Sequence, residues 1–183
     1  HVWILADYVR TALASEDAVQ WLEEVAPPKT TCNDGLRAAI GGNAVQAAPY
    51  NLRGSGVVIA EWDAGHAEST HSDLSPRVTY GDTASVHYHS THVAGTAIGS
   101  GALSGGKLRG MAPSASLVSY EWPDTITEMD SETKDAIVNH SAEISTNSWG
   151  YTVDSSNCYL HGYYDSWSVN YDDIVDGKLG YPI

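Results

Sequence analysis

The sequence predicts an α/β fold with a mostly parallel sheet flanked by helices. Short apolar runs that suit buried strands alternate with longer segments that suit helices, which is the pattern of parallel sheets. The clearest strand is the run at residues 57–60, because β-branched residues without polar alternation are typical of a strand covered on both faces. With 183 residues, 42% of them apolar, the chain is long enough to form a sizeable core.

The N-terminal segment is expected to be separate from this fold. A short strand and then a helix are predicted within residues 1–25. Two consecutive prolines inside residues 26–31 cannot continue a helix, so this stretch is predicted to be a linker. The predicted boundary places residues 1–32 in one segment and residues 33–183 in the main domain.

Beyond the linker, helices and strands are expected to alternate. The predicted helices are residues 34–48, with a break at the Gly-Gly pair, residues 90–99 and residues 131–139. The predicted strands are residues 57–60, 116–120 and 143–146. Neither internal repeats nor low-complexity tracts interrupt this order.

Composition excludes some functions and leaves others open. The formal net charge of −14 repels phosphate backbones, so a nucleic-acid partner is not expected. The carboxylates form either a solvated acidic surface or a structural calcium site. A membrane span is not predicted, because no apolar stretch approaches about 20 residues. Cys32 and Cys158 are consistent with one disulfide or with two free thiols.

Asp63 and His89 are the candidate reactive side chains. Asp63 follows the strongest strand signal, and in open α/β sheets reactive groups sit at the carboxyl ends of strands. His89 stands at the start of a predicted helix rich in small residues. In a Ser/His/Asp system the His takes the proton of the nucleophile, while the Asp fixes its tautomer. Taken alone, Asp63 also suits a turn, and His89 also suits a structural role. A catalytic role for the two residues therefore depends on contact between their side chains.

Four blocks of sequence resemble, in order, the subtilisin-like serine proteases. Residues 57–65 followed by residues 71–74 look like the aspartate block of the family, and residues 89–96 look like its His-Gly-Thr-His-Val-Ala-Gly-Thr block. Residues 110–113 resemble its Gly-Val-Ala-Pro segment, and residues 147–150 resemble the segment that lines its substrate cleft. The resemblance implies an endopeptidase on a seven-stranded, mostly parallel sheet, often with bound calcium.

The resemblance also assigns roles to individual residues. Asp63 would orient the histidine, and His89 would act as general base and then as general acid. Ser148, Trp149 and Gly150 would pair with the backbone of an extended polypeptide substrate and form one wall of its pocket. Trp149 has the alternative of being an ordinary core aromatic. The chemistry implied in this way requires no cofactor.

The N-terminal segment resembles the end of a propeptide. Residues 33–37 read Asn-Asp-Gly-Leu-Arg, similar to the Asn-Asp-x-x-Arg opening of large secreted bacterial subtilases of the alkaline kind. Residues 19–23 are similar to the Val-x-Trp-Ile-Glu pattern of their propeptides, so residues 1–32 would be a propeptide tail and linker. The resemblance therefore implies a secreted protein made as a zymogen, and we expect a secretion signal to have been removed.

The sequence departs from the family pattern at three places. Ala64 stands where the family usually has a hydroxyl residue, and Ser90 replaces a frequent glycine. The oxyanion-hole Asn and the Gly-Thr-Ser-Met block of the family do not occur in residues 1–183, and no glycine-flanked elbow surrounds Ser148. We therefore expect an incomplete sheet that is inactive alone, with the Asn and the nucleophilic Ser on a C-terminal chain or segment.

Two alternative functions remain at this point. The first is a catalytically inactive structural or binding fragment of a subtilase, which would hydrolyse nothing even with every partner present. The second is a zinc hydrolase, because histidines are concentrated in one short stretch that includes His-x-His-x-x-His spacing. The histidines in question are His66, His71, His87, His89 and His92.

Overall fold

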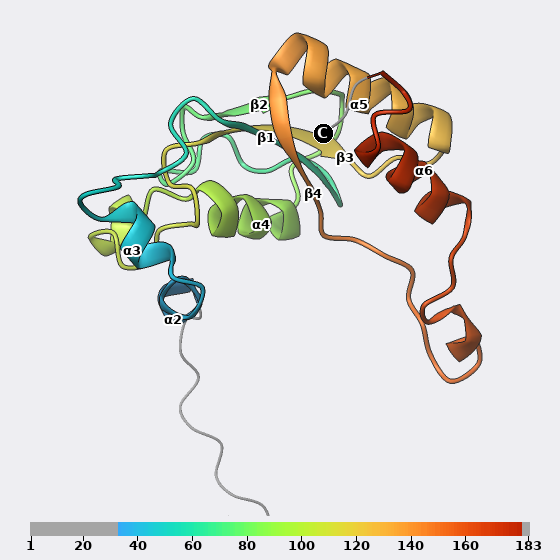
Figure 1. Cartoon of the computed structure of the whole chain (residues 1–183), viewed down its shortest axis with the longest axis horizontal. Helices are drawn as coiled ribbons and strands as arrows, with labels where there is room; N and C mark the ends of the chain where they lie inside the picture. Colours follow the sequence, from blue (N-terminus) through green and yellow to red (C-terminus); the bar gives the residue numbers. More distant parts are fainter. Residues whose placement is uncertain (1–32, 181–183) are drawn as a thin grey trace, which may run out of the picture. The chain divides into compact units, whose positions relative to one another are not determined.

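A computed structural model describes residues 33–180, and a four-stranded sheet with helices on both faces occupies this range (Figure 1). The strands are β1 (Val58–Asp63), β2 (Val78–Tyr80), β3 (Ser116–Glu121) and β4 (Ala142–Asn147). Their order in the sheet is β2-β3-β1-β4, and every neighbouring pair is parallel. The predicted α/β class with a mostly parallel sheet flanked by helices is confirmed.

Helices connect the strands and cover the sheet. The helices longer than one turn are α2 (Asn33–Ala39), α3 (Gly42–Gln46), α4 (Tyr88–Ile98), α5 (Ile126–His140) and α6 (Ser166–Val175). Two short 3-10 helices are η2 (Ala102–Ser104) and η3 (Cys158–Leu160). The predicted strand and helix within residues 1–25 lie outside the described residues, as does Cys32, while Cys158 is free and exposed.

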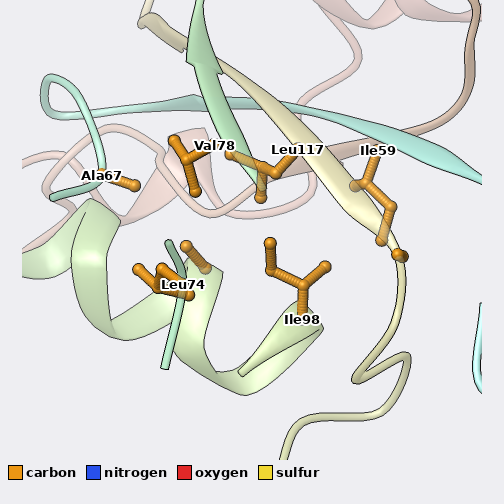
Figure 2. Packing of buried hydrophobic residues seen from close by; sticks show 8 residues of the cluster. Ile59, Ala67, Leu74, Val78, Ile98 and Leu117 are labelled. Atoms are coloured by element: carbon orange, nitrogen blue, oxygen red, sulfur yellow. The ribbon is translucent and has the colours of Figure 1, made fainter. Parts of the chain in front are cut away.

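One face of the sheet packs against α4. Figure 2 shows side chains of β1, β2 and β3 meeting Ile98 of α4 and Leu74 of the loop before β2. The buried members of this cluster are Ile59, Ala67, Leu74, Val78, Ala94, Ile98, Ala115 and Leu117. Because side chains alternate along a strand, the residues of β1 that share the face of Ile59 are Glu61 and Asp63. This face therefore changes from apolar to acidic as β1 approaches its carboxyl end.

The opposite face packs against α5 and α6. Trp62 is fully buried there and stacks on Tyr120 of β3, with ring centroids 5.0 Å apart. Its indole Nε1 donates a hydrogen bond to Oε2 of Glu132 on α5, at 2.9 Å. Burial raises the pKa of Glu132 to about 7, although the hydrogen bond from Trp62 acts in the lowering direction. The central strand is thus fixed to the helix layer by packing and by one polar contact.

Replacing Trp62 by alanine is expected to destabilise the fold by about 3–5 kcal/mol. The change removes a fully buried indole and leaves the partly buried Glu132 carboxylate without its donor. Urea unfolding at neutral pH measures the effect. Trp122→Ala is the matched control, because Trp122 is 44% exposed; equal losses in the two variants would contradict the packing described here.

Several boundaries differ from those predicted. β1 runs to Asp63 rather than ending at residue 60, because the polar residues Glu61 and Asp63 are fully buried in the fold. α5 begins at Ile126, five residues before the predicted start, because Thr125 caps it by accepting a hydrogen bond from the Glu128 amide. β2 and α6 were not predicted. The Asp165 capping box of α6 was the available sequence signal.

Candidate active site

Asp63 is buried at the carboxyl end of a central strand. It is the last residue of β1, between β3 and β4, and its side chain has no exposed surface. Its Oδ1 accepts a hydrogen bond from the Ala64 amide at 2.7 Å and another from the Ser90 hydroxyl at 3.1 Å. These donors fix the carboxylate plane and leave Oδ1 directed at the start of α4.

His89 meets this oxygen from the first turn of α4. Its Nδ1 lies 2.6 Å from Oδ1 of Asp63, and 45% of its side chain is exposed. Because a carboxylate oxygen only accepts, Nδ1 donates the proton and Nε2 keeps its lone pair. The pair therefore combines a buried orienting carboxylate with an imidazole whose other nitrogen can exchange a proton at the surface.

A short backbone ladder holds the two elements together. The loop after β1 pairs with the segment before α4 through hydrogen bonds from the His66 amide to the Ser85 carbonyl and from the His87 amide to the His66 carbonyl, both 2.9 Å. The His87 side chain then caps α4, since its Nδ1 accepts from the His89 amide at 3.2 Å. The segments that carry Asp63 and His89 are thus joined by backbone hydrogen bonds a few residues away from each of these two side chains.

Gly65→Ala is expected to destabilise the fold by roughly 2–4 kcal/mol. Gly65 has φ of +144°, and a Cβ there would lie 2.4 Å from the Ser85 carbonyl oxygen, inside the ladder. Gly56→Ala is the control, because Gly56 also has positive φ but nothing within 4 Å of a built Cβ. Denaturant unfolding of both variants separates the clash from backbone strain. Similar losses would show that the ladder tolerates the extra atom.

Ser90 has a role that the sequence did not reveal. Ala64 has no side-chain hydroxyl to offer Asp63, but the hydroxyl of Ser90, fully buried in α4, donates to Oδ1 of Asp63. Ser90 lies inside a helix, so its replacement of a glycine imposes no strain. The hydroxyl that is missing at residue 64 is therefore supplied to the Asp63 carboxylate by residue 90, although the two residues lie on different elements.

Glu61 is a second buried carboxyl group on the same face of β1. It has no exposed surface, and burial, followed by the negative charge of Asp63, raises its pKa to about 8. The Ser119 hydroxyl donates to its Oε2 at 3.2 Å, which opposes this rise in pKa. Sequence reasoning missed Glu61, because the two-residue spacing from Asp63 places both on one face only once the strand is known to reach residue 63.

Ser148, Trp149 and Gly150 leave the sheet at the same edge as Asp63. Asn147 at the end of β4 lies in register with Trp62, so the following residues emerge beside the end of β1. Ser148 and Gly150 are exposed. The indole of Trp149 is partly buried against α6, edge-on to Trp167 with centroids 5.8 Å apart, and it lines a hollow of about 840 Å³.

The clustered histidines have separate environments. His66 is buried and stacks on Tyr80 with centroids 4.1 Å apart, and His87 caps α4. His71 accepts a hydrogen bond from the Asp73 amide, whereas His92 is exposed. Within residues 33–180, no three His, Cys, Asp or Glu side chains are grouped to hold a metal ion. The structure therefore gives the zinc alternative no support.

Comparisons with known proteins agree with this geometry. Residues 54–175 match the family model described as the subtilase family, which spans more than half of the chain from the loop before β1 to the end of α6. No curated protein matches the chain closely enough to serve as a relative. In the part of the chain that the structure describes, no helix is long and apolar enough to cross a bilayer. This chain belongs to the subtilase family, and at family level it is a hydrolase of the serine-protease type.

Proposed function

We propose that this chain supplies the Asp and His of a secreted serine endopeptidase, with Asp63 orienting His89. The nucleophilic Ser and the oxyanion-hole Asn come from a C-terminal chain or segment. The observation that carries the proposal is the 2.6 Å contact between the buried Oδ1 of Asp63 and Nδ1 of the half-exposed His89. A histidine engaged only in packing would not need its second nitrogen accessible.

The proposed reaction is peptide-bond hydrolysis through an acyl-enzyme. Nε2 of His89 takes the proton of the serine hydroxyl as the serine oxygen bonds to the peptide carbonyl carbon. The imidazolium then gives this proton to the leaving amine as the C–N bond breaks. Water repeats the sequence and releases the acid and the free serine. Asp63 stabilises the imidazolium in both halves, so the chemistry requires no cofactor, and structural calcium remains a prediction.

The edge of the sheet supports a partner segment. β4 is an edge strand among the described residues, and Ile144 on it is 48% exposed. An unpaired parallel edge with an apolar side chain is suited to one more strand, which would bring a following segment to the carboxyl edge of the sheet. Ser148 to Gly150 would then border the substrate on the same edge as Asp63.

Labelling with a fluorophosphonate tests this proposal on the assembled protein. We expect the probe to label a serine on the C-terminal chain or segment, and we expect His89→Ala to abolish both labelling and polypeptide hydrolysis. His92→Ala is the matched control, because His92 lies one turn further along α4 and is exposed. Absence of labelling and of hydrolysis with every partner present would favour the inactive binding fragment instead.

A further inference from the structure

Glu61 carries an ionisable group that the proposed mechanism does not use. Asp63 and Glu61 are both fully buried, two residues apart on β1, and therefore on the same face of the sheet as α4. A buried carboxylate is costly unless it is paired or hydrogen-bonded. Among the described residues, Asp63 has three donors, all to Oδ1, whereas Glu61 has one, the Ser119 hydroxyl.

The strand neighbours of Glu61 in the described sheet carry no positive charge. In register with it are Ser119 on β3 and Thr146 on β4, and neither residue carries charge. α4 carries His89, whose Nδ1 is bonded to Asp63, and the exposed His92. Nε2 of the buried His66, in the loop after β1, lies 3.3 Å from Oδ1 of Asp82. Within the described structure, Oε1 of Glu61 and Oδ2 of Asp63 are both buried without a hydrogen-bond partner. Two full negative charges on this face would therefore lie on buried carboxylates two residues apart, and the imidazole of His89 is bonded to only one of them.

The contact made by Ser119 links Glu61 to the loop that follows Asp63. While its hydroxyl donates to Glu61, its oxygen accepts a hydrogen bond from the Ala67 amide at 3.1 Å. Ala67 directly follows His66, whose backbone belongs to the ladder that joins this loop to the start of α4. Two hydrogen bonds and one peptide link thus connect the carboxyl group of Glu61 to the ladder that holds Asp63 and His89 together.

We infer that Glu61 is a positioning residue for the Asp63–His89 pair. In its neutral form Glu61 leaves Asp63 as the single negative charge that faces the imidazole. Ionisation of Glu61 sets an alkaline limit to the function of the pair. In acting as general base, His89 must release its proton again to the leaving group. A second negative charge on the same face would hold that proton on the imidazole and would drive apart the two carboxylates. The catalytic meaning of this inference rests on the proposed function, whereas its test does not depend on protease activity.

The test uses proton NMR of the His89 Hε1 resonance in the 183-residue chain, followed as a function of pH. We expect an inflection near pH 8, where Glu61 loses its proton to solvent. Glu61→Gln should abolish this inflection, because the amide is neutral at every pH. Ser119→Ala should move it to higher pH, because removing the donor disfavours the carboxylate. Glu143→Gln, at an exposed position on β4, should leave it unchanged.

Each outcome decides the inference. An alkaline inflection that persists in Glu61→Gln, or a wild-type curve without one, overturns it. If Glu61→Gln fails to fold, Ser119→Ala decides, because an unshifted inflection in that variant also overturns the inference. Failure of the proposed function is a different result: a fully assembled protein that never labels or hydrolyses, but whose His89 shows the Glu61-dependent inflection, would lack protease activity while retaining this coupling.

Discussion

Replacing Asp63 by asparagine is expected to lower the kcat of the assembled protease by roughly 10⁴-fold. Oδ1 of residue 63 accepts from the Ala64 amide, the Ser90 hydroxyl and Nδ1 of His89, so the amide oxygen takes this position and the new NH2 group takes that of Oδ2. His89 would then face a neutral amide oxygen, so the imidazolium that forms when Nε2 takes the serine proton loses the carboxylate that stabilises it. The fold should persist, because asparagine has the same shape.

Steady-state kinetics on a polypeptide substrate measures this effect, which should fall on kcat with KM nearly unchanged. Asp176→Asn is the control, because its side chain is 67% exposed at the end of α6. A loss of only a fewfold in Asp63→Asn, with the unfolding curve unchanged, would mean that the 2.6 Å contact is structural and does not support proton transfer.

The second large effect is expected in the pH dependence of stability. The pKa of Glu61 is about 8 in the native state, against 4.5 for an ordinary glutamate. Between these values the native state keeps a proton that the unfolded chain has released. The contribution of Glu61 to the free energy of unfolding is therefore full below about pH 4.5, falls as the pH rises to about 8, and stays low above it. The total loss is about 5 kcal/mol.

Glu61→Gln should remove this loss. The variant is expected to start from a lower stability in acid, because the NH2 group of its amide takes the position of the buried, unpartnered Oε1, but its curve should not show the decline between about pH 4.5 and 8. Urea unfolding of both proteins across this range gives the two curves, and their difference isolates Glu61 from other titrating groups. Parallel curves would show that Glu61 ionises at an ordinary pH despite its burial.

Local patterns were sufficient for the class of fold and for part of each element. The β-branched run at residues 57–60 predicted a buried parallel strand because no polar alternation was present, and β1 contains most of it. The same rule ended the strand too early, because Glu61 and Asp63 are polar. Whether a polar residue belongs to a strand depends on what covers it, and here α4 covers both side chains.

The candidate site divides in the same way. The sequence by itself determined that Asp63 ends a strand and that His89 begins a helix, because both depend on short-range signals. Only the tertiary structure decided that they lie 2.6 Å apart, that Ser90 replaces a hydroxyl missing at Ala64, and that Glu61 is buried beside them. The physical reason is that burial and hydrogen-bond partners come from segments 26 or more residues away, through a sheet register and a loop ladder that no local periodicity encodes.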